Sequence, residues 1–181
     1  MAGTNASVPT REALETALRA VLTAPGLVRP RYGVVAPVVW DETGCHVLVE
    51  VRAAGISQAG DPCFPGGRIE PGETPAMAAA RELREELGVA VDPARFLGRL
   101  PTIQTPLGRD SEAFVCVLSG EEASRTTLNP SEVSELLRVP MAFLLERPEA
   151  SEYAVGGHVI WGMTAGGIRH LCAAWRRAGL G

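Results

Sequence analysis

The sequence contains no lysine, and all 17 basic side chains are arginine. This absence excludes a Walker A phosphate loop and Schiff-base catalysis, because both need a lysine amine. Any cationic contact to a phosphate group must therefore come from arginine, whose planar guanidinium suits phosphate oxygens. With 21 acidic residues the net charge is −4, so the composition does not show the basic surface of a nucleic-acid-binding protein, and we expect no such partner.

Paired cysteines and long apolar runs are also missing. The four cysteines are scattered, without a CxxC pair or the spacing of a zinc site. The apolar runs have the length of strands and fall far short of the roughly 20 residues that span a bilayer, so we expect no membrane partner. The first nine residues lack the apolar segment of a signal peptide. These features favour a cytoplasmic location with reduced thiols.

The patterns that are present predict one α/β domain. A chain of 181 residues with 46% hydrophobic residues is typical of a single soluble domain. Apolar residues recur with helical spacing over 10–22. Strands are predicted over 33–40, 45–52, 95–100, 113–119 and 154–161. Further helices are predicted over 74–88, from 129 onward, and from Thr164 to Arg177, while 53–72 is a long loop rich in glycine and proline of the kind that often carries function.

The helix over 74–88 carries three carboxylates on one face. Glu82, Glu85 and Glu86 stand at positions i, i+3 and i+4, where like charges repel and lower helix stability. A divalent cation would remove this repulsion, and hard oxygen ligands suit Mg²⁺ or Mn²⁺. The same residues are also compatible with a solvated surface helix in which Arg81 and Arg84 pair with neighbouring acids.

The wider pattern favours the metal site. It runs Gly67, five residues, Glu73, seven residues, Arg81-Glu82-Leu83, one residue, Glu85-Glu86, one residue, Gly88-Val89. This segment resembles the Nudix box at every defined position. The resemblance implies an α/β/α sandwich around a mixed β-sheet, with 1–30 as an N-terminal helical segment packing on a Nudix hydrolase domain over 31–181. It also implies hydrolysis of a nucleoside diphosphate linked to another moiety, with Mg²⁺ or Mn²⁺.

Roles follow from the resemblance position by position. The implied metal ligands are Glu82, Glu85, Glu86 and the Gly67 carbonyl. Glu85 or Glu86 would also be the catalytic base, and Glu73 and Arg81 would brace the loop against the helix. Two acids outside the box, Glu112 and Glu132, remain candidate bases. For Glu132 a role as part of a helix cap is an equal alternative.

Three further segments resemble the coenzyme A diphosphatases of this family. They are the block 60–67, which ends in Phe64-Pro65-Gly66-Gly67, the pairs at 132–133 and 139–140, and the segment 159–164. The resemblance implies cleavage of coenzyme A or its derivatives to a phosphopantetheine and adenosine 3′,5′-bisphosphate. The implied substrate-binding residues are Arg52, Arg68, Phe64 and Gly66. The chain departs from that subfamily after Arg52, since it lacks the serine and the second arginine expected there.

Two other functions remain open at this stage. One is hydrolysis of another nucleoside diphosphate derivative, such as ADP-ribose. The other is a Nudix-like module that senses a nucleotide without cleaving it, although such modules often lose box carboxylates that are present here. The last helix, with Leu171 and Trp175 one turn apart, would contribute either to the core or to the interface of a homodimer.

Overall fold

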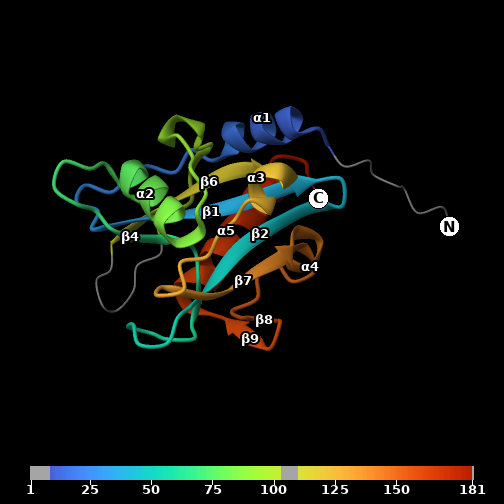
Figure 1. Ribbon diagram of the computed structural model, residues 1–181. Coiled ribbons are helices and arrows are strands. Elements are labelled where there is room, and N and C mark those ends of the chain that lie inside the picture. The colour runs from blue at the N-terminus through green and yellow to red at the C-terminus, as the bar shows by residue number, and fades with distance from the viewer. Residues whose placement is uncertain (1–8, 103–109, 181) are drawn as a thin grey trace.

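The computed structural model describes residues 9–102 and 110–180, drawn as a ribbon in Figure 1. In chain order the elements are α1 (Arg11–Val21), β1 (Tyr32–Asp41), β2 (Gly44–Arg52), β3 (Pro62–Cys63), β4 (Gly66–Arg68), α2 (Pro75–Leu87), a 3₁₀ turn (Pro93–Arg95), β5 (Gly98–Arg99), β6 (Ser111–Ser119), α3 (Gly120–Ser124), β7 (Val133–Pro140), α4 (Met141–Glu146), β8 (Tyr153–Val155), β9 (His158–Ile160) and α5 (Gly162–Arg177). Strands and helices alternate along much of the chain, as the sequence predicts.

The central sheet is mixed. Its strand order is β3-β2-β1-β6-β5, with β4 also paired to β1 and β7 also paired to β2. β1 and β6 run parallel, and Val35 lies opposite Phe114 in their register. The pairs β1–β2, β1–β4 and β2–β7 are antiparallel. The box segment therefore lies in the connection between two neighbouring parallel strands.

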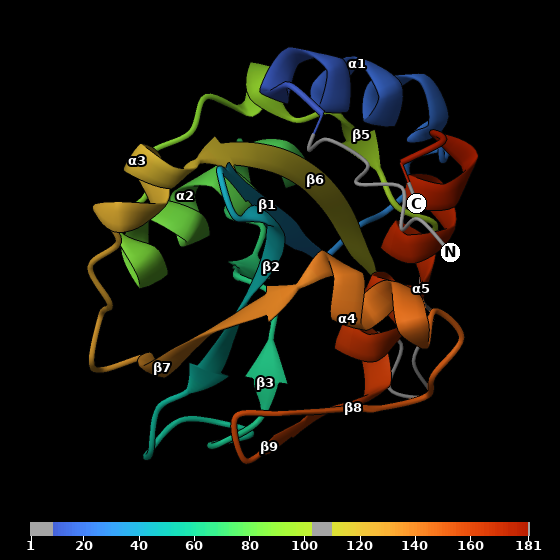
Figure 2. The ribbon, with the colours of Figure 1, turned by 90° about the vertical axis from the view of Figure 1, so that its right-hand side faces the viewer.

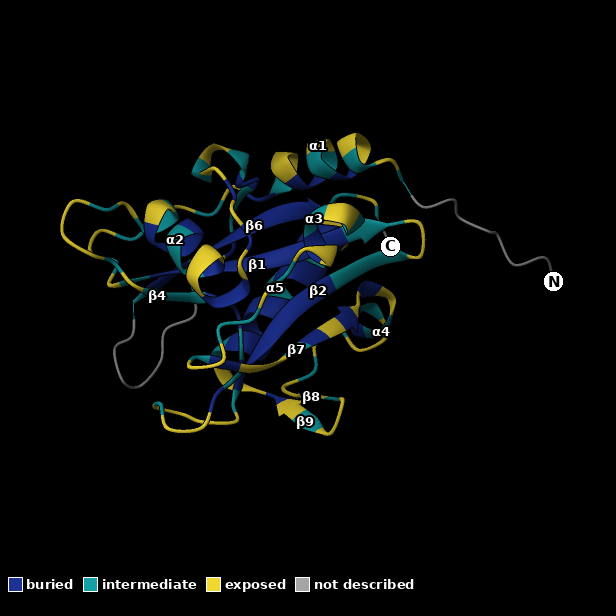
Figure 3. Ribbon diagram, viewed as in Figure 1, coloured by how far each residue is buried: buried dark blue, intermediate teal, exposed yellow. Residues whose placement is uncertain are grey.

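Helices cover both faces of this sheet. Successive residues of a strand point to opposite faces, and along β1 Val35 and Val39 pack with the α2 side while Ala36 and Val38 pack with α1 and α5. Figure 2 shows α2 and α3 on one side of the sheet and α1, α4 and α5 on the other. Figure 3 shows buried strands inside and exposed residues on the outer faces of the helices. The expected α/β/α sandwich in a single domain is confirmed.

The N-terminal helix packs into the same core. Thr10 caps α1 by accepting a hydrogen bond from the Ala13 amide, and Leu14 and Leu18 are fully buried beside α5 residues. The division into 1–30 and 31–181 stays a prediction. Within the described residues, no helix is both long enough and apolar enough to cross a membrane.

The helix predicted from 129 onward is wrong, because 133–140 form the strand β7 beside β2. Asn129 and Glu132 have the spacing of a helix cap, but the Asn129 side chain accepts from the amide and hydroxyl of Ser131 and forms a tight turn. Val133, Leu137 and Val139 are buried in the cores of the sandwich. Pairing with β2 thus decides the structure of this segment.

Other boundaries also shift. The predicted loop over 53–72 contains β3 and β4, short strands that pair with β2 and β1. The predicted strand over 95–100 is reduced to β5, and the one over 154–161 is the hairpin β8–β9 around Gly156-Gly157. The last helix begins at Gly162, and Thr164 lies inside it, where its hydroxyl donates to the Pro62 carbonyl.

Candidate active site

Local signals in the sequence determine where α2 begins and ends. The Thr74 hydroxyl accepts from the Met77 amide, and Pro75 occupies the first helical turn, where its missing N–H costs nothing. Gly88 ends the helix with φ +70°, a conformation that glycine adopts without strain. The predicted bounds of this helix are confirmed.

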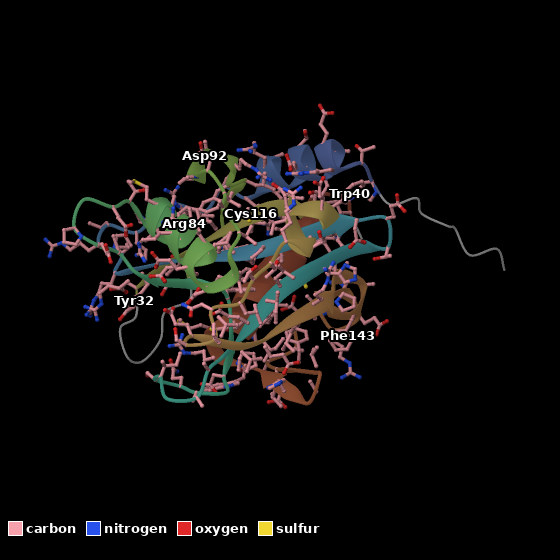
Figure 4. The ribbon with its side chains drawn as sticks, viewed as in Figure 1. Tyr32, Trp40, Arg84, Asp92, Cys116 and Phe143 are labelled. Carbon is pink, nitrogen blue, oxygen red and sulfur yellow. The ribbon has the colours of Figure 1, made fainter. Side chains whose placement is uncertain are left out.

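A second glycine places α2 against the sheet. A Cβ atom at Gly33 on β1 would lie 2.0 Å from the Pro75 carbonyl oxygen, so only glycine permits this close approach. Leu83 and Leu87 then fill the core below the helix. Arg84 lies on the exposed side of α2, as Figure 4 shows. Between these two faces, Glu82 and Glu86 lie against Gly67 and Gly66 of β4.

Three carboxylates meet at this edge of α2. Glu82, Glu86 and Glu132 each offer an oxygen, and these oxygens all lie within 4.8 Å of one another. We call them the acidic cluster. Glu86 is 3% exposed, and the other two are half-buried. Two members were predicted as metal ligands, and the third is the outside acid for which sequence left a helix cap as an equal alternative.

The turn before β7 positions Glu132. Asn129 donates from Nδ2 to Glu132 Oε1 at 3.2 Å, and its backbone amide donates to the Glu86 carbonyl oxygen at 2.9 Å. The Thr127 amide likewise donates to the Leu87 carbonyl at the end of α2. The segment is therefore anchored on the C-terminal end of the box helix, which brings the third carboxylate to the other two.

Two glycines of the predicted loop face the same cluster. The Gly66 amide donates to Glu86 Oε2 at 2.9 Å, and Gly66 has φ +155°. A Cβ at Gly67 would lie 2.1 Å from Glu82 Oε1, so a side chain there would displace the carboxylate. Both positions thus require glycine for backbone conformation or for close approach.

Arg81 joins the loop to the helix. Its guanidinium donates to both oxygens of Glu73, at 2.9 and 3.1 Å, and to the Arg68 carbonyl at 3.0 Å. It also donates to Glu82 and Glu85, at 2.8 and 3.0 Å. Hydrogen bonds from Arg81 hold the pKa of Glu73 below its ordinary value.

The other predicted acids lie apart from the cluster. The Glu85 side chain is 44% exposed and accepts from Arg81. Its roles as ligand and base stay predictions. Glu112 on β6 accepts from Arg99 Nε at 2.8 Å and from the Leu27 amide at 2.6 Å, so it ties the segment after α1 to the sheet. A structural partner thus accounts for each oxygen of Glu112.

Sequence reasoning missed Glu50. This residue lies on β2, is 1% exposed, and accepts a hydrogen bond from Cys63 Sγ at 3.4 Å through Oε1. Its other oxygen, Oε2, is buried and has no hydrogen-bond partner. The signal was available, since Glu50 interrupts an apolar run that continues from Val47 to Val51.

Burial controls the electrostatics of this region. Loss of solvent raises the pKa of Glu82, although hydrogen bonds from Arg81 oppose the shift. Burial also raises the pKa of Glu86, and the neighbouring charge of Glu50 adds to the effect. The pKa of Glu50 is raised by burial and is lowered in part by the Cys63 thiol. Without a cation, these buried carboxyl groups therefore favour the protonated form, because water cannot solvate their negative charge.

A cavity of about 360 Å³ adjoins the cluster. Its walls are Tyr32, Val34, Arg52, Ser57, Gln58, Cys63, Phe64, Gly66, Gly67, Pro101, Ser111, Ala113, Met163, Thr164 and Gly167. Gly66 and Gly67 line the cavity and also lie against Glu86 and Glu82, so they connect the cavity to the cluster. Figure 4 shows Tyr32 at the β4 end of the sheet.

The cavity includes three of the four predicted substrate-binding residues. Arg52 lines it and donates from Nε to the Ser57 carbonyl at 2.8 Å. Phe64 is 7% exposed and packs on Gly167 of α5, where a Cβ would lie 2.7 Å from its ring. Arg68 is not part of the lining, but its guanidinium lies 5.8 Å from the centre of the Tyr32 ring.

The donor set fits a hard divalent cation. Three carboxylates converge, Glu86 is almost completely buried, and a further buried carboxylate oxygen nearby lacks a partner. Uncompensated buried charge is unfavourable, and oxygen ligands of this kind bind Mg²⁺ or Mn²⁺. Such an ion beside a cavity with an arginine in its wall is suited to a phosphorylated ligand.

Comparison with known proteins identifies the family. A family model of the NUDIX domain matches residues 29–157. The chain belongs to the Nudix family. The mitochondrial coenzyme A diphosphatase NUDT8 of Homo sapiens is 31% identical over 140 residues, which cover 66% of this chain and 58% of that protein. The CTP pyrophosphohydrolase of Escherichia coli is also 31% identical, over 131 residues that cover 64% of this chain and 95% of that protein.

Solved structures agree on the Nudix fold. An Ap4A hydrolase of C. elegans aligns with a TM-score of 0.57 and 13% identity, over 79% of this chain and 96% of that one. The chain spans only 40 to 65% of the length of three curated Nudix relatives, NUDT8 among them.

Proposed function

We propose that this Nudix protein is a divalent-metal-dependent diphosphatase and that its substrate is coenzyme A or a derivative. The observation that carries the proposal is the acidic cluster beside a cavity whose wall contains Arg52. Gly66 and Gly67 line the cavity and lie against Glu86 and Glu82, so a diphosphate bound against these glycines would reach the cluster while the rest of the substrate occupies the cavity.

The proposed ligands are Glu82, Glu86 and Glu132, with Glu85 and the Gly67 carbonyl as the further ligands implied by the box. When bound, the ion would neutralise the diphosphate charge and acidify a water molecule for attack at phosphorus. Neighbouring residues hold the carboxylates in position. Gly66 fixes Glu86 through its amide, and Asn129 fixes Glu132 through its side chain. A carboxylate of this group would accept the proton of the attacking water.

Several observations support coenzyme A. Two of the three segments that resemble the coenzyme A diphosphatases meet in one cavity, since Phe64 lines it together with Met163 and Thr164. The Thr164 hydroxyl also donates to the Pro62 carbonyl, which joins these segments directly. NUDT8, a coenzyme A diphosphatase by name, is among the relatives. The largely apolar wall suits a pantetheine arm.

A specific observation favours the alternative, another nucleoside diphosphate derivative such as ADP-ribose. Among the described residues that line the cavity, Arg52 is the single arginine. Coenzyme A carries a 3′-phosphate in addition to its diphosphate, and two anionic groups would share this one cation. The CTP pyrophosphohydrolase relative, at the same identity as NUDT8, acts by name on a different substrate.

A substrate panel tests the proposal. Purified protein with Mg²⁺ or Mn²⁺ is given coenzyme A, acetyl-coenzyme A, dephospho-coenzyme A, ADP-ribose and 8-oxo-dGTP, and products are resolved by mass spectrometry. We expect coenzyme A to yield a phosphopantetheine and adenosine 3′,5′-bisphosphate at the highest kcat/KM. Equal or faster cleavage of ADP-ribose favours the alternative substrate. Absence of cleavage across the panel contradicts the proposed hydrolase.

Arg52 and Arg68 offer a matched pair of variants. If Arg52 binds the 3′-phosphate, Arg52→Ala should lower kcat/KM for coenzyme A about 10- to 100-fold more than for dephospho-coenzyme A, the range expected when a partly exposed charge contact is lost. Arg68→Ala, whose guanidinium lies outside the cavity lining, should show a smaller preference. If Arg52→Ala lowers kcat/KM equally for coenzyme A and dephospho-coenzyme A, Arg52 does not bind the 3′-phosphate.

A further inference from the structure

The strand β2 carries a buried carboxylate on the side of the box helix. Leu48 packs in the core beneath α2, while Val47 and Val49 pack in the core on the other face of the sheet. Glu50 stands two residues after Leu48, so it shares the face toward α2. At 1% exposure it is shielded from solvent as fully as the leucine.

The two oxygens of Glu50 have different surroundings. Oε1 accepts from the Cys63 thiol, a weak donor, whereas Oε2 has no hydrogen-bond partner. Three further groups act on this carboxylate: Arg52 and Glu132 through their charges, and the Glu86 carboxyl, which lies close enough to share a proton with it. The Arg52 guanidinium donates to the Ser57 carbonyl, and two of the three neighbours are acidic.

Glu112 shows how the same chain satisfies a buried glutamate when its role is structural. It lies on the neighbouring part of the sheet, is 5% exposed, and has Arg99 and the Leu27 amide as partners for its two oxygens. Buried charges are ordinarily compensated in this way. Glu50 lacks such a partner, and a leucine would fill its position at lower cost.

We propose that Glu50 is a further carboxylate of the metal centre, which approaches the bound cation through Oε2 from the sheet side and shares it with Glu86. The inference rests on the proposed metal site. Glu50 is almost completely buried and lies close enough to Glu86 for the two carboxyl groups to interact. Two carboxylates are enough on this side, because Mg²⁺ commonly keeps several waters and takes its remaining ligands from substrate phosphates.

One substitution separates this role from a merely structural one. If Glu50 only shared a proton with Glu86, Glu50→Gln would reproduce that hydrogen bond, because the glutamine amide donates where the protonated acid would. The same amide oxygen can still accept from Cys63. As a metal ligand, however, a neutral glutamine is much weaker than a carboxylate. The two roles therefore predict opposite effects on metal affinity from an isosteric change.

The experiment is a titration of the metal-free protein with Mn²⁺. Binding is measured by calorimetry and by the electron paramagnetic resonance signal of free Mn²⁺. We expect Glu50→Gln to weaken Mn²⁺ binding at least tenfold, and its melting temperature in EDTA to equal or exceed that of the wild type. The matched control is Glu112→Gln, which should melt earlier without a change in Mn²⁺ affinity. Glu50→Leu is a second variant that serves if Glu50→Gln does not fold.

The outcomes are distinguishable from failure of the proposed function. Wild-type protein that binds Mn²⁺ and cleaves a diphosphate, together with unchanged affinity in Glu50→Gln, overturns the role of Glu50 and leaves the function intact. Equal weakening in the Glu50 and Glu112 variants also overturns it, because the effect is then not local. Wild-type protein that binds no Mn²⁺ contradicts the metal site itself.

Discussion

Two groups of carboxylates in this molecule have opposite surroundings. Glu122, at the start of α3, accepts from Arg95 through both oxygens, from Arg11, and from the Ser119 amide. These contacts, with the Arg95 hydrogen bond foremost, lower the pKa of Glu122 to about 2. The acidic cluster is more deeply buried, yet among the described arginines only Arg81 reaches it, through Glu82.

The presence or absence of arginine partners distinguishes carboxylates that stabilise the fold from carboxylates that are suited to bind a ligand. Where the chain supplies arginines, carboxylates join elements that are far apart in sequence, as Glu122 joins α1, the turn before β5 and α3. Where no arginine pairs with a buried carboxylate, its negative charge is unfavourable, and a bound cation can offset that free energy. Uncompensated charge in an otherwise well-paired protein is thus a positive indication of a binding site.

The largest expected effect comes from Glu86→Gln. The change keeps the shape of the side chain and its bond from the Gly66 amide, but it removes a charge from the cluster. We expect kcat to fall on the order of 10²–10⁴-fold, as for loss of a metal ligand or base. Steady-state kinetics on the best substrate measures this. Glu122→Gln serves as control, and a comparable loss there would break the distinction between the two groups. Glu85→Gln, exposed and paired with Arg81, should lose less.

The next effect is on stability through metal binding. A cation that binds only the folded state adds about 2.7 kcal/mol at one hundred times its dissociation constant. We expect millimolar Mn²⁺ to raise the melting temperature by roughly 5–10 °C for a chain of this size. The rise should vanish in Glu82→Ala and persist in Glu122→Gln. Thermal unfolding followed by circular dichroism checks it, and an identical melting curve with and without Mn²⁺ would count against a preformed site.

A third effect concerns pH in the absence of metal. Because burial raises the pKa values of Glu82 and Glu86, these acids favour folding while protonated and oppose it once ionised. The melting temperature in EDTA should therefore fall as pH rises from the ordinary carboxylate range through neutrality. Glu86→Gln should flatten this slope, and saturating Mn²⁺ should also flatten it. A wild-type profile that stays level from pH 5 to pH 9 would contradict the raised values.

The smallest effect concerns Glu122, whose contribution to stability falls as pH decreases, opposite to that of Glu82 and Glu86. Since the folded-state pKa of Glu122 is lowered to about 2, its contribution is present above the ordinary carboxylate range and is lost as pH falls toward 2. Glu122→Gln should lower the melting temperature at pH 7 by about 1–3 °C, because its partners are partly exposed. The difference from the wild type should shrink in acid. If it widens instead, the arginine contacts do not stabilise the fold.

The box helix and the shared face of two of its carboxylates could be predicted from the sequence because their signals are local. Thr74, Pro75 and Gly88 mark the ends of α2 within one short segment, and the spacing of Glu82 and Glu86 puts them on one face. These features depend on neighbours a few residues away, so no knowledge of the sheet is needed.

The remainder of the site depends on strand pairing, which sequence spacing does not reveal. Asn129 and Glu132 have the same spacing in a capped helix as in the tight turn that the structure shows, and only pairing of β7 with β2 distinguishes them. Glu50 belongs to the same class, because its nearness to Glu86 follows from the register of β2. The charge within an apolar strand was the one local sign.

The parallel pairing of β1 with β6 has a consequence for how the protein is made. Val35 and Phe114 must meet across a long intervening chain, and pairings of such separation form slowly. The box helix leaves the ribosome well before β6 and β7, so Leu83 and Leu87 can pack on β1 and β2 before Phe114 and Val133 complete their core. Because Glu132 is the last of the three cluster residues along the chain, the cation finds all three carboxylates only after the turn before β7 has packed on α2. It should therefore slow unfolding more than it speeds folding.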